Sequence, residues 1–232
     1  MNDELKFTVI SDTHYYSKKN FVDGFDKNKK PKPGQLFFSR SEEIVEHTFD
    51  CLCKNDTPDI VLISGDLTYN GERTSHDEMK AALKKLQQKG KRVYVITATH
   101  DYTTPRMPTY GIDKNDKYIE VESVKRTQLL KYYGDFGYNN AIAKHKSTMS
   151  YVAQLADGYR LFALNDDYGD PDCGFSDELM NWVKTEANNA KRDGQYIIAM
   201  THHPLVPPSP IYTAVAKGDM LNDYELRSKQ LS

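Results

Sequence analysis

The stretch Val9-Ile10-Ser11-Asp12-Thr13-His14 decides the fold, because a short apolar run ends there in Asp-x-His. In this pattern, a buried strand places a carboxylate and an imidazole at the end of a sheet. Three more apolar runs end in the same kind of residue: 60–63 before Ser64-Gly65-Asp66, 93–96 before Thr97-Ala98-Thr99-His100-Asp101, and 196–200 before Thr201-His202-His203-Pro204. In open α/β sheets, ligands gather at the carboxyl ends of the strands. Asp and His together suit zinc, manganese and iron.

Hydrophobic periodicity between these runs predicts crossover helices. Strands are expected over residues 6–10, 59–64 and 92–97, with helices over 41–54 and from Ser75 to Gly90. Ser39 with Glu42 and Ser75 with Glu78 fit capping boxes. The β-α-β-α-β alternation predicts an α/β fold with a parallel sheet.

The second half of the chain predicts a different pairing. Asp157-Gly158 lies between apolar runs at 149–155 and 159–165, which indicates a hairpin of antiparallel strands. Helical patterns follow at 119–133 and 176–192, and a strand is expected at 195–200.

Composition indicates one soluble globular domain spanning residues 1–232, with loop insertions near 15–38 and 102–146. The net charge of −2 argues against a nucleic-acid binder driven by bulk charge. No apolar run approaches the roughly 20 residues of a membrane helix. The N-terminus lacks a signal-peptide core, so we expect a cytoplasmic protein by default and an extracytoplasmic one if the N-terminus was trimmed. The lysine-rich passage 15–35 is read as a surface loop, in preference to a lid for an anionic substrate.

In order and spacing, Asp12-x-His14, Gly65-Asp66, His100-Asp101 and His202-x-Pro204 resemble the motifs of calcineurin-like metallophosphoesterases over nearly the whole chain. Residues 65–72, 75–78 and 135–139 are most similar to the bacterial branch related to cyclic-nucleotide phosphodiesterases. The resemblance implies a two-sheet αββα sandwich with mixed parallel and antiparallel strands. It also implies hydrolysis of a phosphoester, expected to be a phosphodiester such as a cyclic nucleotide, by attack of a metal-bound hydroxide.

The resemblance further implies two divalent ions, manganese, iron or zinc, which in such sites lie roughly 3.5–4 Å apart. It assigns Asp66 as the bridging ligand, Asp12 and His14 to the first ion, and His202 to the second.

The same resemblance assigns His100 and Asp101 to catalysis. His100 would protonate the leaving oxygen or stabilise developing charge, and Asp101 would orient His100. His203, Asn70 and Tyr102, with Tyr69 beside them, are candidates for lining the substrate pocket.

Each motif has a structural alternative when taken alone. Asp12 could cap a turn, Gly65-Asp66 could be a plain turn, and His100 and His202 could be core histidines. Four motifs in the same order favour the metal site. The remaining histidines, His47, His76 and His145, are expected at the surface, and Asp166-Asp167 in a solvated turn.

Two departures from the family pattern stand out. Ala98-Thr99 replaces Gly-Asn before His100, so the second ion would have Thr99 as a weak ligand at best, and Ala98 would restrict a turn that needs positive φ. No Gly-His-x-His follows His202, so we expect a chain that is incomplete at its C-terminus, lacks its last strands and has a weak second metal site.

These departures leave alternatives open. One is a degenerate, non-catalytic relative that acts as a binding or interaction protein. Another is a nuclease, which the absence of a basic stripe disfavours, and a protein phosphatase is a weaker variant. The expected partners are a small phosphoester and, through an unpaired sheet edge, another copy of the chain.

Overall fold

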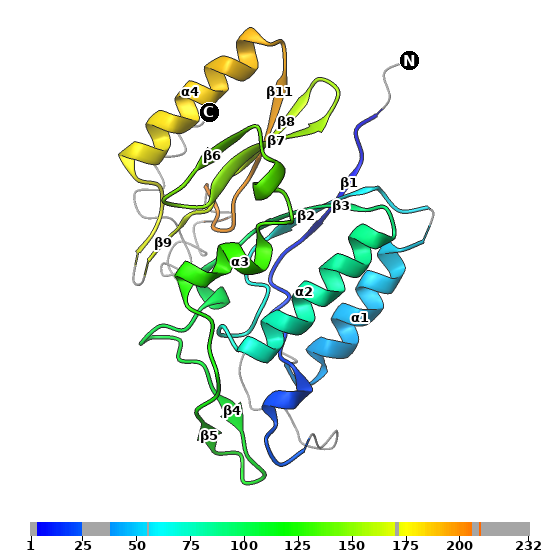
Figure 1. Ribbon diagram of the computed structural model, residues 1–232, viewed down its shortest axis with the longest axis vertical. Coiled ribbons are helices and arrows are strands. Elements are labelled where there is room, and N and C mark those ends of the chain that lie inside the picture. The colour runs from blue at the N-terminus through cyan, green and yellow to red at the C-terminus, as the bar shows by residue number, and fades with distance from the viewer. Residues whose placement is uncertain (1–3, 25–37, 55, 170–171, 206–208, 210–232) are drawn as a thin grey trace.

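A computed structural model describes residues 4–24, 38–54, 56–169, 172–205 and 209 and contains two packed sheets (Figure 1). The first has the order β1-β2-β3 and is wholly parallel: β1 (Phe7–Ile10), β2 (Ile60–Ser64) and β3 (Arg92–Ile96). The second has the order β11-β8-β7-β6: β6 (Ala143–His145), β7 (Ser150–Ala156), β8 (Tyr159–Ala163) and β11 (Tyr196–Met200). β11 runs parallel to β8, and the other pairs are antiparallel. The expected hairpin is therefore confirmed.

Helices cover the outer face of each sheet (Figure 1). The first sheet is covered by α1 (Ser41–Leu52), α2 (Arg73–Gln88) and α3 (Leu129–Tyr133), and the second by α4 (Asp177–Arg192). Two short ribbons complete the strands: β4 (Gly111–Ile112) with β5 (Tyr118–Ile119), and β9 (Asp167–Gly169) with β10 (Asp172–Cys173). The expected αββα layering is confirmed.

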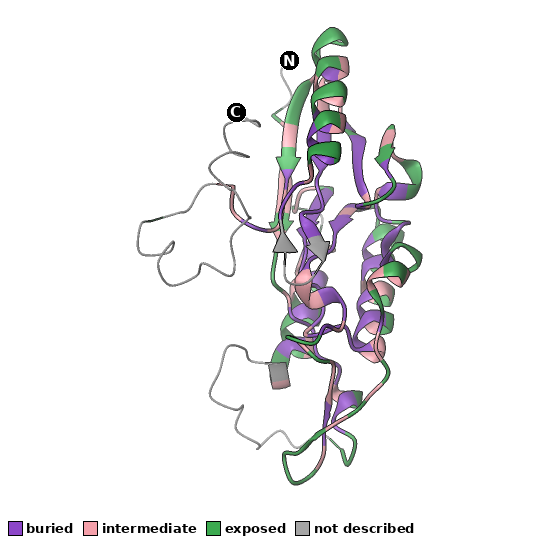
Figure 2. Cartoon of the chain, turned by 90° about the vertical axis from the view of Figure 1, so that its left-hand side faces the viewer, coloured by how far each residue is buried: buried purple, intermediate pink, exposed green. Residues whose placement is uncertain are grey.

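The central strand β2 is buried on both faces, which Figure 2 shows as a purple interior between the layers. Val61 and Ile63 pack toward the helices, while Ile60 and Leu62 pack against the second sheet. Continuous apolar strands are typical of parallel sheets covered on both sides.

Two of the edge strands of these sheets differ from the expectation of buried strands. β1 and β11 are edge strands, and Val9 is 57%, Tyr196 70% and Ile197 42% exposed. An apolar run shows that a strand forms, but whether a neighbour covers it depends on sheet order. The sequence pattern does not contain that information.

Several local expectations are wrong. α2 begins at Arg73 after Glu72, so Ser75 is not its cap; its buried hydroxyl accepts the N–H of Ser17. Neither α1 nor α2 has a side-chain N-cap bond. Residues 120–128 are not α-helical, because Glu122 O accepts the N–H of Arg73 and Val124 N–H donates to Gly71 O. These bonds to the start of α2 replace the helical ones.

The lysine-rich passage is not simply a surface loop. Tyr15, Tyr16 and Phe21 at its start are buried. Its second half, within residues 25–37, and the polar tail after residue 209 lie outside the described residues, so the alternative of a lid is not tested. In the described part of the chain, no helix is long and apolar enough to cross a membrane. Cys51 and Cys53 are free thiols.

Candidate metal centre

The loops after β1, β2 and β3 are tied together by backbone hydrogen bonds. The N–H of Asp12 donates to Gly65 O at 3.2 Å, and the N–H of His14 donates to Asp66 O at 3.0 Å. The N–H of His100 donates to Asp66 Oδ1 at 3.0 Å. Three sequence motifs therefore meet at one end of the first sheet, as the strand-end rule predicts.

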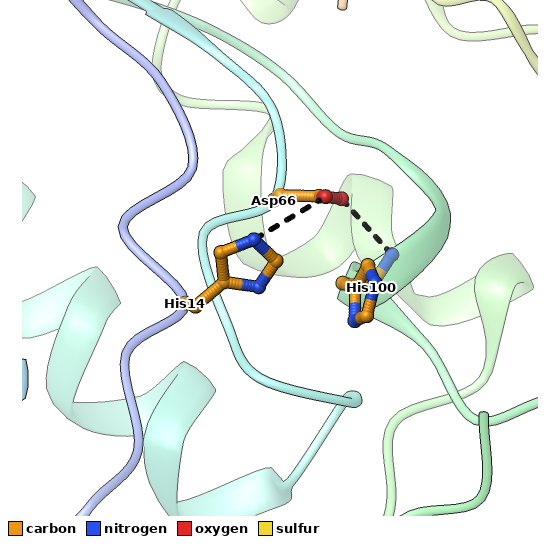
Figure 3. A group of neighbouring side chains, drawn as sticks. All are labelled: His14, Asp66 and His100. Carbon is orange, nitrogen blue, oxygen red and sulfur yellow. Dashed lines mark hydrogen bonds and ion pairs between the residues drawn. The ribbon is translucent and has the colours of Figure 1, made fainter. Parts of the chain in front are cut away.

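Asp66 is the centre of this cluster (Figure 3), where His14 and His100 lie on either side of its carboxylate. Asp66 Oδ2 lies 3.7 Å from His14 Nε2 and 3.3 Å from His202 Nε2, and only 4% of the residue is exposed. Two groups of candidate ligand atoms converge within 4.8 Å: His14, Asp66 and His100, and Asp12, Asp66 and His202. Asp66 belongs to both groups, which is the arrangement a bridging carboxylate requires.

The backbone is strained at three of these residues. Asp12, His14 and Asp66 have φ values of 55°, 39° and 51°. A non-glycine residue in this region costs on the order of 1–3 kcal/mol, and such residues concentrate at functional sites. This left-handed backbone conformation directs the three side chains toward one point, and it is an independent indication of a functional site.

His202 crosses from the second sheet to the first. Its Nδ1 donates to Ser64 O at 2.9 Å, which leaves Nε2 facing Asp66. Gly65 makes this approach possible, because a Cβ there would lie 3.0 Å from His202 Nδ1 and 2.7 Å from Ala98 Cβ, with φ at +101°. The glycine of the Gly65-Asp66 motif is thus required by space as well as by conformation.

Electrostatics link Asp66 and His202 strongly. Burial disfavours ionised Asp66, but the hydrogen bond and positive charge of His202, with the imidazoles of His100 and His14, hold the pKa of Asp66 below its usual value. Burial likewise opposes charge on His202, but the hydrogen bond to Asp66 and its charge raise the pKa of His202 to about 9. The hydrogen bond with His14 lowers the pKa of Asp12. Ionised carboxylates beside imidazoles form a site ready to exchange a proton for a cation.

His100 is oriented from the loop after β2. Its Nδ1 lies 2.6 Å from Tyr69 O and 2.8 Å from Asn70 Oδ1. Both are acceptors, so Nδ1 carries the hydrogen and Nε2 is left as the reactive nitrogen. Burial lowers the pKa of His100 below its ordinary value, which favours a neutral ring.

Asp101 differs from the expectation that it orients the His100 ring. Its carboxylate accepts the N–H of Thr68 at 3.0 Å and that of Ala98 at 2.9 Å. Asp101 therefore closes the turn that presents His100. Burial raises its pKa to about 7.

Residues with weaker assignments are placed as follows. Thr99 begins the 3-10 turn Thr99–Asp101, and Ala98 before it is extended with φ −141°, so Ala98 does not restrict a glycine-only turn. The Tyr102 ring is buried and its hydroxyl donates to Asp167 Oδ1 at 2.7 Å. His203 is buried, with Nδ1 3.1 Å from Asp166 Oδ1. Asn70, also buried, contacts His100 as described.

Sequence reasoning missed several buried polar residues. Asp166 and Asp167 are buried, not in a solvated turn, and His145 is buried as well. His76 is fully buried in α2, with Nδ1 2.6 Å from Tyr133 Oη and Nε2 2.9 Å from Asp101 O. Burial lowers its pKa to about 3, so it is neutral. For Asp166 a usable signal existed, because it follows an apolar run as the other motifs do.

The cluster fits divalent ions in its donor chemistry. It offers carboxylate oxygens and imidazole nitrogens, and it shares one carboxylate between two ligand groups. The buried His14 Nδ1 also has no hydrogen-bond partner among the residues that the structure describes. Buried polar atoms are normally paired, so an unpaired imidazole nitrogen is consistent with a partner that is an ion.

Comparisons with known proteins agree with this geometry. The structure resembles the crystal structure of a dimetal phosphatase from Danio rerio, with a TM-score of 0.63, 12% sequence identity, and coverage of 97% of this chain and 76% of that one. A search of curated proteins found no match. The sequence profile of the calcineurin-like phosphoesterases matches residues 5–228, nearly the whole chain. The protein therefore belongs to the calcineurin-like phosphoesterase family, whose members hydrolyse phosphoester bonds.

Proposed function

We propose that this metal-dependent phosphoesterase acts on a small phosphodiester, with a cyclic nucleotide as the first candidate. The main support for a metal centre is the position of Asp66. It belongs to two groups of candidate ligands, and the ligand atoms of each group lie within 4.8 Å of one another. The similarity of residues 65–72 and 135–139 to the cyclic-nucleotide branch supports the substrate. Among the described residues, Asp12 and Asp66 form ion pairs with histidines and with no lysine or arginine.

The family resemblance proposes Asp12, His14 and Asp66 for one ion, and Asp66 and His202 for the other, with Thr99 as a weak addition. The structure groups the same residues differently, with Asp12 beside Asp66 and His202, and His14 beside Asp66 and His100; Asp66 is shared in both cases. Two bound ions would supply an activated water nucleophile and counter-charge for the phosphoryl oxygens. Oxygen and imidazole donors support manganese, iron or zinc. The Danio rerio protein with a similar fold is likewise a dimetal phosphatase.

His100 is the proposed proton carrier. Its Nδ1–H is held by Tyr69 O and Asn70 Oδ1, so the ring cannot turn away and Nε2 stays available. A neutral imidazole can accept at Nε2 the proton that the attacking water gives up. Returning that proton to the leaving oxygen completes the cycle. Asp101 supports this role through the turn, by accepting the N–H groups of Thr68 and Ala98.

A second candidate is a non-catalytic relative that binds a phosphoester or a protein. It is favoured by Thr99 in place of an amide ligand and by only two strong proposed donors, Asp66 and His202, for the second ion. A nuclease is disfavoured by the net charge of −2.

The test measures metal content and substrate choice together. At saturating Mn²⁺ we expect about two ions per chain, the second bound more weakly and lost first on desalting, and at least about tenfold faster hydrolysis of bis(p-nitrophenyl) phosphate than of p-nitrophenyl phosphate, with cyclic AMP also cleaved. His100→Ala should lower kcat by about 10²–10⁴-fold, while His47→Ala, an exposed histidine of α1, should not change it.

The outcomes separate the candidates. A preference for the monoester would refute the diester assignment. Two bound ions without turnover of any ester would favour the non-catalytic relative, and no bound ion would refute the metal centre.

A further inference from the structure

Asp166 is a fully buried carboxylate at the carboxyl end of β8. β8 pairs in parallel with β11, and the N–H of Leu164 continues the ladder to Met200 O at 2.9 Å. Asp166 therefore lies beside the segment that carries His202, although 36 positions separate the two residues in sequence.

Three N–H groups of that segment donate to the Asp166 carboxylate. Oδ2 accepts the backbone N–H groups of His202 at 3.1 Å and His203 at 2.8 Å. Oδ1 accepts from the His203 ring at 3.1 Å. The His202 and His203 rings are in edge contact, with centroids 4.7 Å apart, so the whole turn is fixed around one carboxylate.

The His202 ring is consequently held from both sheets. Asp166, in the second sheet, fixes its backbone, while Ser64 O, in the first, accepts its Nδ1–H at 2.9 Å. With both ends fixed, Nε2 remains 3.3 Å from Asp66 Oδ2. A ligand that is already oriented loses little freedom when it binds an ion.

We propose that Asp166 is a positioning residue that fixes His202 as a metal ligand and thereby sets the affinity of the ion that His202 holds. The proposal rests on the metal centre proposed above. Groups that orient metal-binding histidines typically change metal affinity by about 10–100-fold when they are altered.

The neighbouring Asp167 offers a matched control. It too is buried, but its carboxylate accepts from Tyr102 Oη at 2.7 Å and Arg126 Nε at 3.2 Å. The hydrogen bonds that fix the His202 backbone go to Asp166. The two adjacent aspartates thus differ in the element that they hold.

Asp166→Asn is the conservative variant. Its amide oxygen can still accept the two backbone N–H groups, but without the carboxylate charge these bonds weaken. Its NH₂ group also faces a ring nitrogen of His203 that donates a hydrogen in the wild type. The His203 ring must change tautomer or the turn must shift. We therefore expect a folded protein with a weaker His202 site.

The experiment titrates Mn²⁺ into each purified full-length chain and follows free Mn²⁺ by electron paramagnetic resonance. For Asp166→Asn we expect one of the two dissociation constants to rise about 10–100-fold, and for Asp167→Asn neither to rise more than about threefold. In a His202→Ala background, Asp166→Asn should cause no further change, because the group through which it acts is gone. A purely structural role for Asp166 would not produce this non-additivity.

Three results would overturn the proposal: unchanged Mn²⁺ binding in Asp166→Asn, an equal loss in the His202→Ala background, or a wild-type chain that binds no Mn²⁺. Should Asp166→Asn not fold, Asp166→Ser is measured in the same way, since its hydroxyl can accept one of the N–H groups. A wild type that binds two ions but hydrolyses no ester would refute the proposed reaction and leave this test intact.

Discussion

Replacing Gly65 by alanine should damage the site through one added methyl group. The backbone at Gly65 has φ +101°, which costs an L-residue on the order of 1–3 kcal/mol. The new Cβ would lie 2.7 Å from Ala98 Cβ, and overpacking of this kind costs about 1–3 kcal/mol. It would also lie 3.0 Å from His202 Nδ1, so the ring must retreat by about 0.5 Å.

That retreat weakens the hydrogen bond from His202 Nδ1 to Ser64 O, now 2.9 Å, which contributes about 1 kcal/mol. Together these effects lower the free energy of unfolding by about 4 kcal/mol, or about 8–16 °C in Tm for a chain of this size. The displaced ring should also weaken Mn²⁺ binding by about tenfold or more.

The assay combines thermal unfolding with Mn²⁺ titration, and other positions in the chain supply the controls. Gly90 has φ +88°, and a methyl group added there would have no atom within 4 Å, so Gly90→Ala measures the backbone cost alone. Adding Ala98→Gly to Gly65→Ala removes the 2.7 Å contact and should restore part of the stability but not the metal affinity. If Gly65→Ala loses no more stability than Gly90→Ala and binds Mn²⁺ as the wild type does, the reasoning about His202 is wrong.

Buried polar groups and the ion itself give three more expected outcomes. Burial raises the pKa of Glu72 from 4.5 to about 7, so its contribution to stability is present below about pH 4.5 and is lost as pH rises through about 7. Glu72→Gln should remove about 3 kcal/mol of this pH dependence of the free energy of unfolding, measured by urea unfolding from pH 4.5 to 8. An unchanged dependence of the unfolding free energy on pH would contradict it. Tyr133→Phe leaves Nδ1 of the buried His76 unpaired and should lower the free energy of unfolding by about 1–3 kcal/mol in urea; a neutral effect would show that this bond is dispensable. Mn²⁺ at about 100 times its dissociation constant should stabilise the fold by about 2.7 kcal/mol in thermal scans, and by less in His202→Ala, whereas equal gains would place the ion elsewhere.

The strand-end motifs could be predicted because each is encoded in a few consecutive residues. An apolar run followed by Asp or His specifies both the strand and the residue at its end, and this placed Asp12, Asp66 and His100 together correctly. The Asp157-Gly158 turn was equally local, and it forms as expected between β7 and β8.

What could not be predicted depends on which elements become neighbours. The apolar run before Asp166 indicates a strand end, but its partner His202 follows only from the parallel pairing of β8 with β11. His76 reads as a surface residue of α2 until α3 and the turn at Asp101 cover it. Edge or centre position is likewise decided by sheet order, which is why exposed Val9 reads the same as buried Val61.

The proposed ligands of the metal centre are divided between the two layers of the sandwich. Asp12, His14 and Asp66 follow strands of the first sheet, while His202 follows β11 of the second. An ion held by both groups therefore links the two sheets, and its binding energy is available only while the sheets are packed together. Occupancy of that ion and docking of the sheets are then linked equilibria: the ion that His202 holds keeps the two sheets together, and opening of the sandwich releases it. Amide hydrogen exchange in β11, the exposed edge strand that leads to His202, should slow when the ion binds.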